Sequence, residues 1–152
     1  MAKEIERKFL LKEYPWPNKT AIRYRQGYLN SSKERTVRVR TIGDKGFLTV
    51  KGITVEASRL EFEYEIPFQD ANKLLEICEK SLIEKNRYKV EEGGLVWEID
   101  EFLGENQGLI IAELELESED QEFEKPDWVG EEVTGDPRYY NANLIKNPYT
   151  KW

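Results

Sequence analysis

The sequence predicts an α+β domain built around an eight-stranded antiparallel β-barrel with a few flanking α-helices. Three observations support this fold class. Short segments with apolar and charged residues at alternate positions dominate the chain, turn signals separate them, and only one segment has the spacing of a clear amphipathic helix. Eight strands are also enough to close a small barrel. The 152 residues suit one domain, so we expect a single domain over residues 1–152.

The expected strands are short and follow one another with turns between them. The turn GDK joins two of them into a hairpin, and a pair of glycines joins two others. In chain order, the eight segments are EIERKFLL, TAIRYRQGYLN, TVRVRTI, GFLTVKGI, SRLEFEYEI, EKNRYKVEE, LVWEIDEF and LIIAELELES.

The clearest helix is expected in QDANKLLEICEKSL, directly after Pro67. Its apolar residues recur at helical spacing, which predicts one buried face that includes Cys78. A short helix is also expected around DQEFEK, and another near residues 139–145. The aromatic residues of the C-terminal part are expected to pack against the sheet.

Charged residues occupy alternate positions on seven of the strands, and most of these strands carry one sign only. Arg38 and Arg40 make one strand basic, whereas Glu61, Glu63 and Glu65 make another acidic. A solvated outer face is the simplest explanation for one such strand. For seven strands, a closed sheet with its charged face inward explains the pattern better. Crowded interior carboxylates need cations and interior arginines need anions, so this interior would suit a divalent metal and a polyanion together.

Composition narrows the possible chemistry. The chain has no histidine and one cysteine, which excludes a serine–histidine triad, a cysteine–histidine pair, the usual zinc sites and an intrachain disulfide. A metal must therefore be held by oxygen, which favours Mg²⁺ or Mn²⁺. The net charge of −7 argues against nucleic acid or an anionic membrane as a partner. Without an apolar run of signal-peptide or membrane-span length, we expect a cytoplasmic protein.

The opening EIERK resembles the Glu-x-Glu-x-Lys signature of the CYTH superfamily, the triphosphate tunnel metalloenzymes. TVRVR, GFLTVKG, SRLEFEYEIP, IEKNRY, WEIDEF, AELELES and VGEEVTGDPRYYNANL also resemble short bacterial members, in the same order and essentially end to end. The resemblance implies an eight-stranded barrel forming an open tunnel, in which a triphosphate binds with a divalent metal and a phosphoanhydride is cleaved. Members of this length look most like inorganic tripolyphosphatases.

The resemblance also implies roles for the alternating charges. Those expected to bind phosphate are Lys8, Arg38, Arg40, Lys51, Lys85 and Arg87. Those expected to hold metal are Glu4, Glu6, Glu98, Asp100, Glu113 and Glu115. Those expected to take part in catalysis, by holding metal, stabilising phosphate or orienting water, are Glu4, Glu6, Lys8, Glu61, Glu63 and Asp100.

Two other functions remain open at this point. An adenylyl cyclase of the same family would convert ATP to cyclic AMP, although no motif assigns an adenine pocket. A non-catalytic polyphosphate or nucleotide sensor would use the same tunnel. The sequence leaves open which triphosphate is the substrate, whether Tyr28 lines the tunnel mouth or the core, and whether an outward apolar face supports a homodimer.

Overall fold

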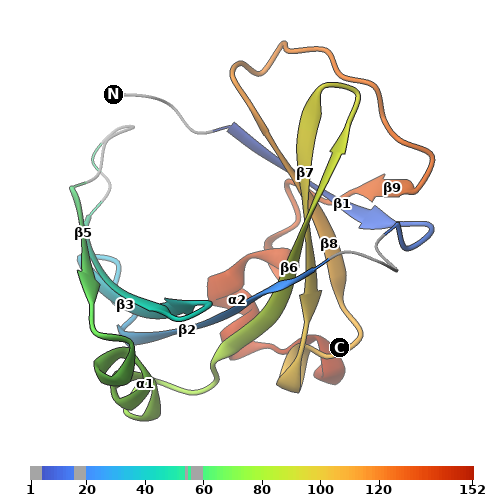
Figure 1. Ribbon diagram of the computed structural model, residues 1–152. Coiled ribbons are helices and arrows are strands. Elements are labelled where there is room, and N and C mark those ends of the chain that lie inside the picture. The colour runs from blue at the N-terminus through green and yellow to red at the C-terminus, as the bar shows by residue number, and fades with distance from the viewer. Residues whose placement is uncertain (1–4, 16–19, 54, 56–59) are drawn as a thin grey trace.

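The computed structural model describes residues 5–15, 20–53, 55 and 60–152. Within these residues, nine antiparallel strands form one sheet in the order β5-β4-β3-β2-β6-β7-β8-β1-β9 (Figure 1). The strands are β1 Ile5–Leu11, β2 Ile22–Asn30, β3 Arg35–Ile42, β4 Lys45–Gly52, β5 Glu61–Ile66, β6 Ile83–Glu92, β7 Leu95–Phe102, β8 Ile110–Leu116 and β9 Val129–Glu132. The helices are α1 Phe68–Glu76 and α2 Asn141–Lys146, with 3₁₀ turns at Gly104–Asn106, Pro137–Tyr139 and Tyr149–Lys151.

The prediction of an eight-stranded barrel is wrong in strand number and in closure. All eight expected strands are present, but β9 adds a ninth, and the sheet is strongly curved without closing, with β5 and β9 at its two ends (Figure 1). The four residues of β9 pair with β1 through Phe9↔Glu132 and Leu11↔Val129. A Cβ at Gly130 would lie 3.1 Å from the carbonyl oxygen of Leu10, so glycine allows this close approach.

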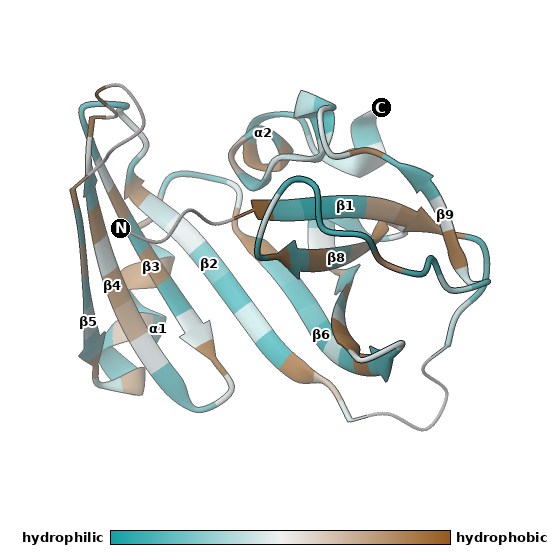
Figure 2. Ribbon diagram, turned by 90° about the horizontal axis from the view of Figure 1, so that it is seen from above, coloured by the Kyte–Doolittle hydropathy of each residue, from teal (hydrophilic) through white to brown (hydrophobic). Residues whose placement is uncertain are grey.

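The predicted alternation of faces is confirmed by the strand register. Residues opposite one another in an antiparallel sheet point to the same face. The same face of the sheet therefore carries the pairs Arg38↔Thr49, Arg87↔Asp100 and Glu98↔Glu113. Bands of hydrophilic and hydrophobic residues alternate along the strands in Figure 2. Helix α1 lies on the convex side of the sheet in Figure 1, so the charged side chains line the concave side.

The convex face carries the apolar core in two parts. Over β3 and β4, Ala71 and Leu75 of α1 pack against Val39. The helix ends at Glu76, earlier than expected, because the N–H of Ile77 already bonds to the carbonyl of Leu74 and tightens the last turn.

The second part of the core lies over β1, β7 and β8, under an extended segment instead of a helix. The helix expected around DQEFEK is absent, and residues 121–126 have no regular structure. Phe123 there packs edge-on against Phe9 and Trp97, and Trp128 packs against Trp97. Packing of these aromatic rings thus holds this segment against the sheet.

One end of the concave face is apolar and is covered by the C-terminal part of the chain. Ile83, Phe102 and Ile111 share the charged face by register but cluster with Leu144 and Ile145 of α2. The helix expected near residues 139–145 is confirmed as α2. None of the described helices is both long and apolar enough to cross a membrane.

Candidate active site

On one arm of the curved sheet, β3 to β5, three of the predicted cations lie near two of the predicted glutamates. Arg40 donates through Nη2 to Glu63 Oε1 at 3.0 Å, and Arg38 Nη2 lies 3.9 Å from the same oxygen. Lys51 Nζ lies 3.7 Å from Glu61 Oε1. The predicted residues of these strands are therefore brought together, with Glu61 and Glu63 neutralising part of the positive charge.

The two arginines of this arm have unused hydrogen-bonding capacity. The Nε atoms of Arg38 and Arg40 are buried and have no hydrogen-bond partner in the described structure. Burial, followed by the positive charge of Arg40, lowers the pKa of Arg38 below its ordinary value. Buried donors without partners are costly, and an anion placed between these guanidinium groups would satisfy them.

The facing arm, β6 and β7, holds an ion cluster around the fully buried Asp100. Asp100 accepts hydrogen bonds from Lys85 Nζ at 2.8 Å and from Arg87 Nε and Nη2 at 2.7 and 2.9 Å. Its side chain is 0% exposed. Burial alone would raise the pKa of Asp100, but Lys85 and Arg87 hold it below its ordinary value. Both carboxylate oxygens are thus used in orienting two predicted phosphate-binding cations.

An aromatic ring that the sequence analysis did not single out completes this cluster. Tyr24 on β2 lies opposite Lys85 in the register. The Cζ atom of Arg87 lies 4.8 Å from the centre of the Tyr24 ring, and Lys85 Nζ lies 5.7 Å from it. These cation–π contacts add to the ion pairs with Asp100 in holding the two cations. The sequence signal that could have placed Tyr24 on this face is its alternation with Gln26 and Tyr28 along β2.

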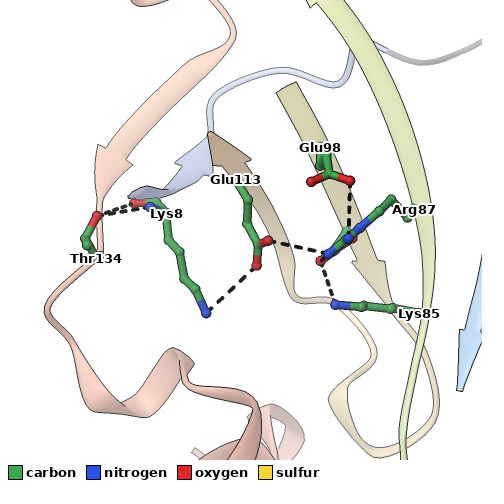
Figure 3. A network of polar contacts seen from close by, with 7 residues as sticks. Lys8, Lys85, Arg87, Glu98, Glu113 and Thr134 are labelled. Carbon is green, nitrogen blue, oxygen red and sulfur yellow. Dashed lines mark hydrogen bonds and ion pairs between the residues drawn. The ribbon is translucent and has the colours of Figure 1, made fainter. Parts of the chain in front are cut away.

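Figure 3 shows how Glu98, Glu113 and Lys8 extend the cluster across β7, β8 and β1. Glu98 Oε2 accepts from Arg87 Nη1 at 3.2 Å, and Glu113 Oε2 lies 3.4 Å from Arg87 Nη2. Glu113 Oε1 is 3.9 Å from Lys8 Nζ. Burial, with the nearby charge of Asp100, raises the pKa of Glu113 to about 7. The nearest cationic atoms lie at least 3.4 Å from Glu113, whereas those bound to Asp100 lie within 2.9 Å.

Thr134 fixes the backbone of β1 at Lys8 and was also missed. The N–H of Lys8 donates to Thr134 Oγ1 at 3.0 Å, and the N–H of Val133 donates to the carbonyl of Lys8 at 2.8 Å. No sequence pattern pointed to Thr134, because it lies just beyond the short strand β9.

The predicted metal ligands are placed unevenly. Glu4 lies outside the described residues, whereas Glu6 pairs with Glu115 in the β1–β8 register and both are exposed. Within the described residues, no three acidic side chains are grouped closely enough to hold a metal ion. The donor set is nevertheless all oxygen and lies on adjacent strands, and the raised pKa of Glu113 marks a carboxylate that a cation would stabilise. The residues therefore fit a hard divalent cation.

A cavity of about 210 Å³ adjoins the concave face beside α2. Arg38 and Lys51 contribute to its wall, and so do Lys80 and Lys146, which the sequence analysis did not select. Both carboxylate oxygens of the acidic Glu79 at this cavity already accept hydrogen bonds, from the hydroxyl and the N–H of Ser31. The cavity is therefore cationic and suited to an anion.

Comparison with known proteins identifies the family. The CYTH domain matches residues 2–149. The chain belongs to the CYTH family. It is 57% identical over 151 residues to an inorganic triphosphatase of Acetivibrio thermocellus, covering 98% of this chain and 97% of that one. An inorganic triphosphatase of Nitrosomonas europaea is 40% identical over 146 residues, covering 93% and 95%.

Solved structures agree with this membership. The crystal structure of the inorganic triphosphatase NE1496 is 38% identical, covers 95% of each chain and superposes with a TM-score of 0.78. A protein from Pyrococcus furiosus superposes with a TM-score of 0.51 at 21% identity, covering 78% of this chain and 81% of that one, a likeness that shows the fold alone.

Proposed function

We propose that this CYTH protein is an inorganic triphosphatase that hydrolyses tripolyphosphate to pyrophosphate and phosphate with the help of a divalent cation. The observation that carries the proposal is the concave face itself. The six cations predicted to bind phosphate, from β1, β3, β4 and β6, face it, and Arg38 and Arg40 of β3 keep buried donors without partners. A small, highly charged anion without an apolar group matches such a surface.

The cations would act by binding and orienting the substrate. Phosphoryl transfer depends mainly on positioning and charge neutralisation, so no protein nucleophile is required. Arg38, Arg40 and Lys51 would hold one end of the tripolyphosphate, and Lys85 and Arg87 the other. Water adds to a terminal phosphorus, the bond from that phosphorus to the bridging oxygen breaks, and pyrophosphate leaves with the electron pair of that bond.

The carboxylates divide between orienting cations and holding metal. Asp100 and Glu63 orient cations, as their hydrogen bonds indicate. Glu6, Glu113 and Glu115, together with Glu4, are the proposed metal ligands. A bound Mg²⁺ or Mn²⁺ would neutralise phosphate charge and favour the attack of water.

The test is phosphate release from tripolyphosphate, ATP and thiamine triphosphate, each with Mg²⁺, Mn²⁺ or no metal. We expect metal-dependent release that is strongest with tripolyphosphate. Glu6→Gln should remove this turnover and leave the fold intact, whereas Glu13→Gln, an exposed glutamate just beyond β1, should not. Cyclic AMP from ATP would instead indicate a cyclase, and tight binding without any product would indicate a sensor.

A further inference from the structure

Gln26 of β2 lies on the concave face between the two cationic arms of the site. Strand β2 has β3 as its neighbour on one side and β6 on the other (Figure 1). In the register, Gln26 lies opposite Arg40 of β3 and opposite Ile83 of β6. Lys85 follows Ile83 by two residues on the same face, so it is a diagonal neighbour of Gln26, about 7–8 Å away. The carboxamide is therefore placed beside a phosphate chain that spans the two arms.

The side chain of Gln26 is buried and unpaired. The residue is 4% exposed, and among the described residues none donates a hydrogen bond to its carboxamide or accepts one from it. Its two cationic neighbours have other partners, because Arg40 Nη2 donates to Glu63 and Lys85 Nζ donates to Asp100. A buried polar group without a partner lowers the stability of a fold. The contacts within the chain thus give no reason for an amide at this position.

A second unpaired donor lies beside this amide. The Nε atom of Arg40 is buried and has no hydrogen-bond partner in the described part of the chain. Because Gln26 and Arg40 are directly opposite one another, their Cβ atoms are about 5 Å apart. An oxyanion suits such a pair, since its oxygen atoms can accept hydrogen bonds from both side chains. Glutamine also supplies its donor without adding a positive charge next to Arg40 and Lys85.

We propose that Gln26 is a substrate-binding residue whose Nε2 donates a hydrogen bond to the central phosphate of tripolyphosphate. This inference rests on the proposed function, in which β3 and β4 hold one end of the substrate and β6 the other, so that the central phosphate lies over β2. When the bond from the terminal phosphorus breaks, the bridging oxygen stays on the central phosphate with the electron pair and gains negative charge. A donor to that phosphate stabilises the leaving pyrophosphate.

The test compares wild type with Gln26→Leu, which removes the amide and keeps most of the side-chain volume. Titration calorimetry in EDTA gives the dissociation constant for tripolyphosphate, and phosphate release with Mg²⁺ gives kcat/KM. We expect affinity and kcat/KM each to fall about 10- to 100-fold, the usual effect of one hydrogen bond to a charged group. The melting temperature without ligand should stay near that of wild type, because no hydrogen bond within the chain is lost.

The matched control is Asn86→Leu. Asn86 lies between two phosphate-binding cations in the sequence, but it is opposite Arg23 in the register and faces the convex side. This variant should bind and cleave tripolyphosphate like wild type.

Gln26→Glu separates loss of substrate binding from damage to the fold. The new carboxylate has nearly the size of the amide and would lie beside Arg40 and Lys85, so the melting temperature without ligand should stay equal to that of wild type or rise. The same negative charge repels phosphate, and the affinity for tripolyphosphate should therefore fall further than in Gln26→Leu.

A folded Gln26→Leu with the affinity and kcat/KM of wild type would overturn the proposal, and so would an equal loss in Asn86→Leu or tighter binding by Gln26→Glu than by Gln26→Leu. If Gln26→Leu and Gln26→Met both melt more than about 10 °C below wild type, the amide stabilises the fold and the proposal is also overturned. A wild type that binds tripolyphosphate without releasing phosphate would refute the proposed hydrolysis, while the dissociation constants would still decide the role of Gln26. A wild type that does not bind tripolyphosphate would overturn both.

Discussion

Replacing Asp100 with asparagine separates two roles that its position allows, orienting cations and binding metal. Asp100→Asn removes the negative charge that Lys85 and Arg87 share, while its side chain is fully buried and that of Lys85 is 4% exposed. Removing one partner from a buried ion pair costs about 3–5 kcal/mol, because the remaining charges are left uncompensated. For a domain of this size, that loss corresponds to a fall in melting temperature of roughly 10 °C.

The assay combines thermal unfolding with steady-state kinetics. We expect Asp100→Asn to unfold at the lower temperature without ligand, and tripolyphosphate to raise its melting temperature less than that of wild type, because the variant binds it more weakly. The KM for tripolyphosphate should rise at least about tenfold, because Lys85 and Arg87 are no longer held in place. The Mg²⁺ concentration that gives half-maximal activity should stay unchanged.

A metal ligand would behave in the opposite way. If Asp100→Asn left the melting temperature unchanged and shifted the Mg²⁺ midpoint, Asp100 would bind metal, and the proposed orienting role would be refuted. Glu101→Gln is the matched control, because Glu101 is the next residue on β7 but accepts from Tyr88 at 3.4 Å on the other face. It should leave both the KM and the metal midpoint near those of wild type.

Three further results are expected. Arg7 donates to Glu132 at 2.8 Å and, with Thr134, lowers the pKa of Glu132 to about 2, so this pair stabilises the fold above pH 4.5 and the effect is lost as the pH falls toward 2. Because Glu132 is one-third exposed, Glu132→Gln should cost only about 1 kcal/mol in urea unfolding at pH 7, and nothing at pH 2; an equal cost at both pH values would contradict the pairing. Leu144→Ala in α2 should lower the free energy of unfolding by about 2–5 kcal/mol, measured by the same method, because Leu144 is fully buried; a loss below 1 kcal/mol would show that α2 is loosely packed. Chelation by EDTA should abolish phosphate release and added Mg²⁺ or Mn²⁺ should restore it, whereas full activity in EDTA would exclude the proposed metal dependence.

The sequence predicted the strands well because a period of two is a local property. Alternation in a segment such as LEFEYEI determines both that a strand forms and which side chains share a face. Strand β9 lacks this signal, since four residues that include Gly130 cannot show a period, and its pairing depends on the free edge of β1. The segment around Phe123 has a helical composition, but contacts with Phe9 and Trp97 on the sheet outweigh this local preference.

The predicted phosphate-binding residues all fall on the concave face for the same local reason. What the sequence did not contain was the pairing between strands that are distant in the chain. Tyr24 becomes a neighbour of Arg87 only through the β2–β6 register, and Thr134 reaches Lys8 across more than 120 residues. Such contacts depend on how the sheet curves and on which strands become neighbours, and neither can be read from alternation within one strand.

The two buried carboxylates of β7 and β8 show why position alone could not assign roles. Asp100 and Glu113 lie on one face of neighbouring strands, and the sequence predicted both as metal ligands. Their pKa values nevertheless shift in opposite directions. The pKa of Asp100 is lowered because Asp100 accepts three hydrogen bonds shorter than 3 Å from Lys85 and Arg87. The pKa of Glu113 is raised because Glu113 is buried near the charge of Asp100, while Arg87 and Lys8 lie 3.4 and 3.9 Å away. A divalent cation would therefore gain more from Glu113, whose negative charge is poorly compensated, than from Asp100, whose charge is already matched. The distribution of cations within the sheet thus supports our proposal that Glu113 binds metal and that Asp100 orients the cations proposed to bind substrate.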